Sequence, residues 1–434
     1  MRVDSTLALG VGLGLLAACP SEPGVEAQGS SGIDFGAEAS SAAASSASTS
    51  KTDELPTGGA EDTETGAPSF DVPGPDDPVG GCGQGGGGAG FSYIWIANSA
   101  ESTVSKINTQ TLVEEGRYRV HPLDDGNPSR TSVNLDGDVV VANRGGGLTK
   151  IIAEPERCPD AAETSTGPDD VRPWTDGCIA WHTPFEYASQ RPVAWTRGIF
   201  DPATCAHEGA KVWSAGTDGQ NVFDVMLLDG ETGVVEATVD LNAESISPRN
   251  LGLYGGAVDA DGNFWASHVD DGHLVRVDVE DFSIQAWPLP GQVESYGMTV
   301  DASGRPWLCG GRGVARFDPL STSFDIELSV AVDGGGCMVD AENRLWVAGK
   351  SSPDTLVGID VETLEPVRTL EVPGYAKGIS IDFEGHVWAV EQGSRAHRVD
   401  PDTGAVETVM GLNGAYTYSD MTGFALSNAG VPEG

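Results

Sequence analysis

From Phe91 to the C-terminus, hydrophobic residues form short β-prone runs that are separated by Asp- and Gly-containing turns. This alternation is typical of all-β proteins. Four segments align without gaps, and in each an aspartate lies six residues before a tryptophan. They are Gly255–Trp265, Gly297–Trp307, Gly336–Trp346 and Gly378–Trp388. The repeat predicts one structural unit that recurs along the chain.

Three weaker copies extend the series. One copy has Asn134 at the aspartate position and Val140 at the tryptophan position. Another has Asp201 and Trp213 at these positions, with a lengthened turn between them. The seventh anchor is Trp95. A period of about 40 residues with four short strands per unit predicts a β-propeller blade, so seven anchors predict seven blades. The tryptophan is expected to fill the wedge between neighbouring blades, where a large flat side chain buries most area.

The two ends of the repeat region predict how the ring closes. The first copy, Tyr93–Asn98, has only a glycine tract before it and lacks an inner strand. Residues Gly423–Gly430 fit the repeat frame, with Ser427 at the aspartate place, so we expect them to be the inner strand of blade one. A solenoid would instead need atypical capping repeats at both ends. Complementary half-blades favour a closed ring without open sheet edges.

These blades, from residue 91 to residue 434, resemble the virginiamycin B (streptogramin) lyase family and NHL-like propellers. The resemblance implies eliminative opening of a cyclic ester by a histidine base, assisted by a glutamate after the tryptophan and by Mg²⁺. Glu391 matches the glutamate place. The histidine place is taken by Lys377, Tyr254 and Tyr296, while His268 stands at the glutamate-type place of blade four. We therefore take His268, Glu391 and Lys377 as candidate catalytic residues.

The N-terminus predicts export. Leu7 to Ala18 form an apolar stretch that is too short to cross a bilayer but suits a signal peptide. The run Leu16-Ala17-Ala18-Cys19 resembles the bacterial lipoprotein box. This resemblance implies a signal peptide over residues 1–18, lipidation of Cys19 and an outer-membrane or cell-surface location. The alternative is an ordinary secretory signal with an accidental cysteine.

Residues 19–90 contain almost nothing to bury, being rich in Ser, Ala, Gly, Pro, Asp, Glu and Thr. Such a segment cannot offset its ordering entropy, so we expect a disordered, lipid-anchored linker before the propeller at residues 91–434. The only membrane contact that we expect is the lipid anchor, because the chain has no long apolar run.

The charge of the chain excludes one class of partner. The 65 acidic and 24 basic side chains give a formal net charge of −41. This excess repels phosphate backbones, so binding to nucleic acid is not expected. We expect a monomer that recognises a small molecule or a protein.

The cysteines past Cys19 are even in number, which predicts disulfides in an exported chain. Cys309 and Cys337 are expected near the same rim of adjacent blades, so we expect a disulfide between them. Cys158 and Cys178 share one long insertion, where a bridge would pin the loop. Cys82 is one possible partner for Cys205.

Aligning the repeats also predicts a ring of residues at one face of the propeller. Three positions of each repeat are expected at this face: the glycine that begins the aligned segment, the residue before it, and the third residue after the anchor at the tryptophan position. They bring together candidate ligand-binding residues and the catalytic candidates: Arg130, Arg197, Tyr254, Tyr296, Asn98, Asn143, His268, Glu391 and Lys377. Such a mixture of acid, base and donors suits a small-molecule site, and the arginines suit an anion.

Two functions from different classes follow. The first is a binding module that holds a ligand or protein at the polar mouth. The second is an enzyme, either a lyase-like protein that opens a cyclic ester with Mg²⁺ or a metal-dependent lactonase. The mouth could also be a solvated rim without a function. Convergence of His268 with Glu391 is the feature that distinguishes the lyase from the binding module.

Overall fold

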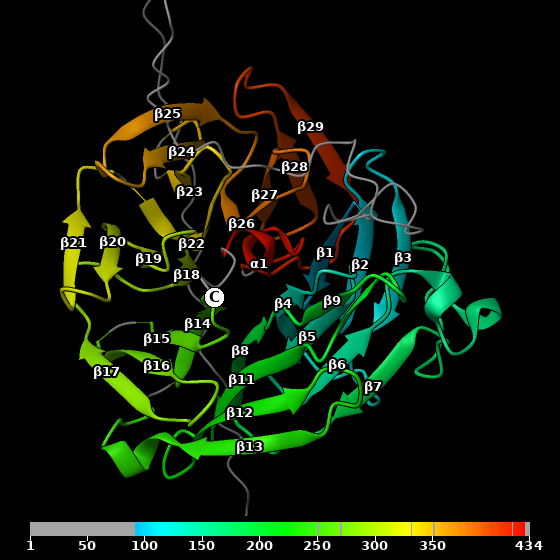
Figure 1. The fold of residues 1–434 in the computed structure, drawn as a ribbon. Helices are drawn as coiled ribbons and strands as arrows, with labels where there is room; N and C mark the ends of the chain where they lie inside the picture. The colour runs from blue at the N-terminus through cyan, green and yellow to red at the C-terminus, as the bar shows by residue number, and fades with distance from the viewer. Residues whose placement is uncertain are drawn as a thin grey trace, which may run out of the picture. The chain divides into compact units, whose positions relative to one another are not determined.

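The computed structural model describes residues 92–249, 251–269, 271–330, 332–349, 352–418 and 420–429. Within these ranges seven β-sheets stand side by side in a ring, with their first strands nearest the centre (Figure 1). The predicted seven-bladed propeller is confirmed. The signal peptide, the linker and Cys19 lie outside the described residues and stay predictions. The described part of the chain contains no helix with the length and apolarity to cross a membrane.

Blades one to four are built in chain order. Their strands are β1 (Tyr93–Asn98), β2 (Thr103–Asn108) and β3 (Glu114–Arg119); β4 (Pro128–Val133), β5 (Val139–Asn143), β6 (Leu148–Ile151) and β7 (Ile179–Thr183); β8 (Ser189–Trp195), β11 (Lys211–Thr217), β12 (Phe223–Asp229) and β13 (Val235–Asp240); and β14 (Leu253–Val258), β15 (Phe264–His268), β16 (His273–Val277) and β17 (Ile284–Pro288). Neighbouring strands within each blade are antiparallel.

Blades five to seven repeat the pattern with short connections. Their strands are β18 (Gly297–Val300), β19 (Pro306–Gly310), β20 (Gly313–Asp318) and β21 (Ser323–Glu327); β22 (Val332–Val339), β23 (Arg344–Gly349), β24 (Thr355–Asp360) and β25 (Pro366–Glu371); and β26 (Ala376–Ile381), β27 (Val387–Glu391), β28 (Arg395–Val399) and β29 (Val406–Met410).

The long insertions lie in blades two and three. Short 3₁₀ helices η1 (Pro155–Arg157) and η2 (Ala161–Glu163) stand between β6 and β7, and η3 (Leu241–Glu244) follows β13. The hairpin of β9 (Ile199–Asp201) and β10 (Ala206–Glu208) separates β8 from β11. The sequence suggested Asp201 as the turn aspartate of blade three. In the structure Asp201 belongs to this hairpin instead.

One aspartate, buried in blades five to seven and partly buried in blade four, holds together the turn and the anchor. In blade six, Asp340 Oδ1 accepts hydrogen bonds from the backbone of Glu342 and Arg344, at 3.0 and 2.9 Å. Its Oδ2 accepts one from the indole of Trp346 at 2.7 Å. Asp259, Asp301 and Asp382 make the same indole bond. The six-residue spacing thus links a turn to the tryptophan beside it.

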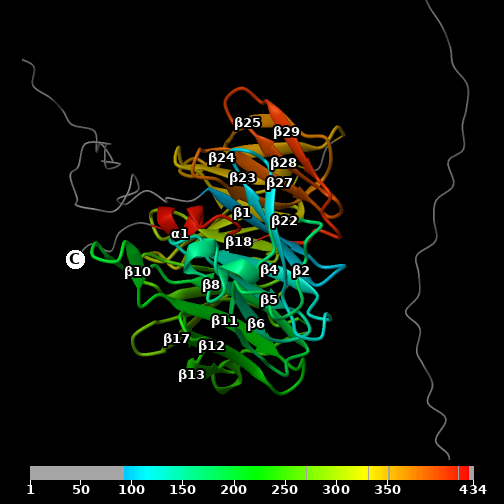
Figure 2. The same cartoon turned by 90° about the vertical axis from the view of Figure 1, so that its right-hand side faces the viewer.

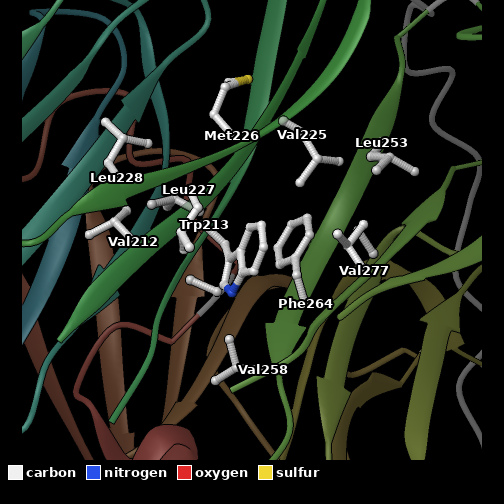
Figure 3. Close-up of a cluster of buried hydrophobic side chains, with 14 of the residues drawn as sticks. Val212, Trp213, Val225, Met226, Leu227, Leu228, Leu253, Val258, Phe264 and Val277 are labelled. Atoms are coloured by element: carbon white, nitrogen blue, oxygen red, sulfur yellow. The ribbon is translucent and has the colours of Figure 1, made fainter. Parts of the chain in front are cut away.

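The anchors are buried where blades meet, as predicted. Trp213 of β11 stacks on Phe264 of β15 with ring centroids 5.6 Å apart and planes at 16° (Figure 3). The Trp213 indole donates to the carbonyl oxygen of Gly262, so the contact joins blades three and four. Every tryptophan anchor has at most 2% of its surface exposed. Buried aromatic area therefore fixes the spacing of the blades.

The repeat glycine is required because inner strands approach one another near the axis. A Cβ on Gly378 would lie 2.1 Å from the carbonyl oxygen of Thr417. A Cβ on Gly297 would lie 2.5 Å from that of Gly335. Both distances are far inside van der Waals contact, so a larger residue would force the blades apart.

Closure by the C-terminal chain is confirmed, but by an earlier segment than predicted. Ala415 bridges Asn98, and the backbone of Tyr416 donates to Ala97 at 3.0 Å. The backbone of Trp95 donates to Met421 at 2.9 Å. Residues 413–418 and 420–421, which we call the closing segment, therefore bond to both ends of β1.

The segment predicted as that strand, from Gly423, instead forms helix α1 (Phe424–Asn428). Gly423 takes a φ of 84°, which ends the extended chain. The backbone of Gly423 and of Leu426 donate to the Asp420 carboxylate, which holds the start of the helix. Seen from the side, α1 and the β9–β10 hairpin lie on the same face of the ring (Figure 2).

Both predicted disulfides are confirmed. Cys309 bridges Cys337 between blades five and six, and Cys158 bridges Cys178 in the blade-two insertion. Cys205 is also disulfide-bonded. The cysteines that are left to pair with it, Cys19 and Cys82, lie outside the described residues.

We expect Asp340→Ala to lower the free energy of unfolding by about 3–5 kcal/mol, because the buried indole and guanidinium donors lose their acceptor. Chemical denaturation measures this. Asp402→Ala is the matched control, since Asp402 also pairs with Arg344 but is 83% exposed. The control should change stability by less than about 0.5 kcal/mol. Equal effects would contradict the role assigned to Asp340.

Truncation after Gly411 should lower the melting temperature and promote aggregation, because it removes the closing segment and leaves the edge of β1 unpaired. Truncation after Ala429 keeps all the closing contacts that the described residues make, and this chain should melt as the full chain does. Thermal unfolding with light scattering compares the two. Identical melting of both truncated chains would show that the ring does not depend on the closing segment.

Candidate functional site

The candidate site is built by β-bulges at the beginning of the inner strands. The register between the first two strands shifts between Pro128 and Arg130, between Leu253 and Gly255, and between Ala376 and Gly378. The extra residues are Ser129, Tyr254 and Lys377. A bulge re-aims a side chain that would otherwise alternate with its neighbours. The place before the repeat glycine therefore marks a ring of re-aimed residues.

In blades one and three the structure fills this place with residues that sequence alignment missed. Gln190 pairs with Gly216 and Val193 with Ser214, which puts Arg191 in the bulge of blade three. In blade one, Tyr416 follows Ala415 and bonds to the backbone of Ala97. Arg197 lies beyond the opposite end of β8, so the structure does not bring it into the ring. The alignment assigned the wrong position to the insertion of blade three, and this error put Arg197 in the place that Arg191 occupies.

Four tyrosines pack against one another at the centre. The ring centroids of Tyr254 and Tyr296 are 5.1 Å apart, and those of Tyr296 and Tyr418 are 4.7 Å apart. Tyr416 meets Tyr418 edge-on at 5.3 Å. Tyr416 and Tyr418 come from the closing segment, so closing the ring also completes this cluster.

Four cations cover the tyrosine rings. The Arg130 guanidinium lies 3.0 Å from the ring centroid of Tyr418. Arg191 lies 4.7 Å above Tyr254, and Arg144 lies 4.3 Å above Tyr416. The Lys377 ammonium lies 3.9 Å above Tyr296 and bonds to the carbonyl oxygen of Gly334. We call these eight residues the arginine–tyrosine mouth: Arg130, Arg144, Arg191, Lys377, Tyr254, Tyr296, Tyr416 and Tyr418.

The three arginines of the mouth have no carboxylate partner among the described residues. Arg130 donates to the carbonyl oxygens of Ser129 and Tyr254, and Arg144 donates to the Asn127 side chain at 2.6 Å. Burial and the charges of Arg191 and Arg130 lower the pKa of Arg144. Most of the other arginines of this acidic chain form ion pairs. The positive charge of these three arginines is therefore concentrated at the mouth without a carboxylate partner in the described chain.

The cluster faces an open pocket of about 580 Å³. Within the described chain its lining mixes polar groups with apolar surface and contains no carboxylate: Ser99, Ala100, Asn127, Arg144, Arg191, Tyr254, Gln392, Gly414 and Tyr416. The size is within the range of small-molecule sites.

The phenols of the mouth form a chain of hydrogen bonds. The Tyr416 hydroxyl is 3.3 Å from that of Tyr254 and also contacts that of Tyr296. Burial alone would raise the pKa of Tyr254, but the Arg130 charge and the neighbouring hydroxyls lower it below its ordinary value. Burial and Tyr254 raise the pKa of Tyr296. The cluster thus favours negative charge on one of its phenols.

The predicted residues three places after the anchor do not point into the mouth. The Asn98 amide donates to Ser105 of β2 at 2.8 Å, and the Asn143 amide donates to the carbonyl oxygen of Val120 at 2.8 Å. Both side chains are fully buried. This place therefore directs a side chain into buried contacts with neighbouring strands and loops, not into the mouth.

Glu391 and His268 follow the same rule in separate blades. Glu391 bonds to Nε2 of His397 at 2.8 Å and pairs with Arg395. His268 is buried, and its Nε2 is 3.0 Å from the carbonyl oxygen of Ser247. Its Nδ1 accepts from the backbone of His273 at 3.2 Å. Burial lowers the pKa of His268, which keeps the ring neutral. The structure does not bring the two residues together.

Of the nine residues predicted for the ring, four are in the mouth: Arg130, Tyr254, Tyr296 and Lys377. Arg144, Arg191, Tyr416 and Tyr418 were missed. Trp195, the last residue of β8, could have located Arg191 in the sequence, because it indicates that the inner strand of blade three lies before the insertion. In the ranges that the structure describes, no group of three or more His, Cys, Asp or Glu side chains is arranged to hold a metal ion.

Comparison with known proteins found no matching family model and no matching curated protein. Solved structures do match. A catalytically inactive virginiamycin B lyase from Staphylococcus aureus with quinupristin is 15% identical over 65% of this chain and 84% of that chain, with a TM-score of 0.46. Apo AztD from Citrobacter koseri is 12% identical over 75% and 96%, with a TM-score of 0.47.

The chain is a seven-bladed β-propeller that is structurally similar to virginiamycin B lyase. At this identity the likeness concerns the fold alone. The function must be argued from the arginine–tyrosine mouth.

We expect His268→Ala to lower the free energy of unfolding by about 1–3 kcal/mol, because two buried backbone groups lose their partner. Circular dichroism during urea denaturation measures the loss. The variant should keep the contacts of the mouth unchanged, so anion binding at the mouth should stay as in the wild type. A stable variant that has lost anion binding would contradict this structural role.

Proposed function

We propose that the propeller is a binding module of the cell envelope that holds an anionic ligand at the arginine–tyrosine mouth. The predicted lipid anchor at Cys19 would keep it at the outer membrane or cell surface. The observation that carries the proposal is the group of three arginines without carboxylate partners in the described chain, of which Arg144 and Arg191 line an open pocket. An anion would relieve their mutual repulsion.

The lining supports an anion with flat, oxygen-rich groups. Arg144 and Arg191 both line the pocket, and guanidinium groups bind carboxylates with two parallel hydrogen bonds. Asn127 and Gln392 add amide donors at its edge. The rings of Tyr254 and Tyr416 offer apolar surface for the body of the ligand. A small organic anion, or a carboxylate of a protein partner, has this chemistry.

The geometry favours binding over the lyase alternative. That enzyme would need a histidine base and a glutamate near one substrate. His268 and Glu391 instead lie in blades four and seven, and each is held by hydrogen bonds within its own surroundings. The polar mouth is occupied by arginines, a lysine and tyrosines.

The test is isothermal calorimetry with citrate and with inorganic phosphate, at constant ionic strength kept with chloride. We expect at least one of them to bind the wild type. Arg144→Gln and Arg191→Gln should each weaken it about 10- to 100-fold, because each removes a charge-assisted contact of about 1.5–3 kcal/mol. Neither change should destabilise the free protein, since each removes uncompensated charge.

Arg368→Gln is the matched control. Like Arg144 and Arg191, Arg368 has no carboxylate partner in the described chain. It donates to the backbone carbonyl oxygens of Pro401 and Asp402 and lies on the outer strand β25. Its substitution should leave anion affinity unchanged. If neither anion binds the wild type, or if all three variants bind alike, the proposal is wrong.

A further inference from the structure

The phenol hydroxyls of the mouth have more protons to donate than acceptors to receive them. The Tyr416 hydroxyl contacts those of Tyr254 and Tyr296, and within the described chain these three groups bond only to one another. Two contacts use two of the three hydroxyl protons, so one donor has no protein acceptor. The Tyr418 hydroxyl, on a side chain that is 2% exposed, also has no partner among the described residues. The cluster therefore needs a further acceptor, and loss of one proton would turn a donor into one.

The arginines nearest to Tyr254 favour the loss of its proton. The guanidinium groups of Arg130 and Arg191 lie 4.8 and 4.7 Å from the centroid of its ring. Neither arginine has a carboxylate partner in the described chain, and Arg130 also donates to the backbone carbonyl oxygen of Tyr254 at 2.9 Å. A neutral phenol attracts these cations only through the quadrupole of its ring, whereas a phenolate attracts them with a full charge.

Tyr254 is the member of the cluster that is best placed to carry this charge. Burial raises its pKa, but the Arg130 charge and the neighbouring hydroxyls outweigh burial and lower this pKa below its ordinary value. Burial raises the pKa of Tyr296 and of Tyr418, so both keep their protons and remain donors. The charged and titratable groups around Tyr254 are Arg130 of β4, Arg191 of β8, Tyr296 before β18, and Tyr416 and Tyr418 of the closing segment, with Arg144 and Lys377 over the rings of Tyr416 and Tyr296.

We propose that a phenolate centred on Tyr254 is the counter-ion of the arginines before a ligand binds, and that the anion binds together with one proton, which this phenolate takes up. The inference rests on the proposed function. Tyr254 and Arg191 line the same pocket, so an anion on Arg191 lies beside the phenolate. Like charges at this distance repel, and a proton taken from solvent removes the repulsion. The protonated hydroxyl is then a donor for the ligand. No other bond forms or breaks.

Proton uptake makes the affinity for the anion depend on pH. Below the pKa of Tyr254 the phenol already holds its proton, so binding takes up none and the affinity is highest. Above this pKa each binding event must also take up a proton, and the affinity falls by about tenfold at most for each pH unit. The mouth should therefore hold its anion in acidic surroundings and release it in alkaline ones.

The first test needs no ligand and follows the near-ultraviolet absorption of tyrosinate while the full chain is titrated with base. We expect one tyrosine per chain to ionise well below the ordinary tyrosine pKa of about 10. Tyr254→Phe should remove this step, and Arg191→Gln should move it to higher pH because one of the two nearest cations is lost. Absence of an early step in the wild type, or its persistence in Tyr254→Phe, would overturn the proposal.

Tyr187→Phe is the matched control for this titration. Tyr187 is also partly buried, but its hydroxyl bonds to Asp224 at 3.0 Å away from the mouth. Burial and the Asp224 charge raise the pKa of Tyr187, so its removal should leave the early step unchanged. If Tyr254→Phe does not fold, comparison of the wild type with Arg191→Gln still decides the question, since an early step that does not move would contradict the proposal.

The second test adds citrate, or phosphate if only phosphate binds, at the pH where half of the early step is complete. The tyrosinate absorption should disappear as the anion saturates the mouth. In calorimetry above this pH, the affinity of the wild type should fall relative to that of Tyr254→Phe by about tenfold at most per pH unit, a comparison that cancels ionisation of the ligand. Saturation without loss of absorption would overturn the proton uptake and leave the anion site intact. If neither anion binds, the proposed function and the proton uptake both fail, whereas the titration still decides whether Tyr254 is the counter-ion.

Discussion

The structure depends on a buried aspartate that accepts hydrogen bonds from its own turn and from the tryptophan indole six residues later. This interaction fixes the turn between the first two strands and the rotation of the anchor at once. The anchor then fills the space between two blades, as Trp213 does against Phe264. Local hydrogen bonding and long-range packing therefore share the same side chains, and a defect in one blade is felt by its neighbour.

A rigid ring allows a bulge near the beginning of the inner strand in blades two, three, four and seven. The bulges face the axis at the beginning of these strands, where tyrosines and cations from different blades meet. Uncompensated arginines at this point are costly in isolation. The rigid core keeps these arginines in place in spite of that cost. Proteins commonly stabilise an unfavourable functional site by the structure around it.

The closing segment joins stability and function. Its backbone bonds to β1 complete the ring, and its side chains Tyr416 and Tyr418 complete the mouth. Opening the ring would remove half of the tyrosine cluster. Binding at the mouth should therefore stabilise the closed ring by mass action.

The sequence by itself determined the number of blades, the anchors and two disulfides, because these follow from a local repeat and from its spacing. It also determined four residues of the mouth: Arg130, Tyr254, Tyr296 and Lys377. Only the tertiary structure decided the rest. The β9–β10 hairpin and the αL turn at Gly423 shift the frame without any periodic signal, so Arg191 and Tyr416 were missed and Arg197 was misplaced. The sequence also could not give the direction of the side chain at the third residue after the anchor. Partners on the neighbouring strand turn His268 and Glu391 into the sheet.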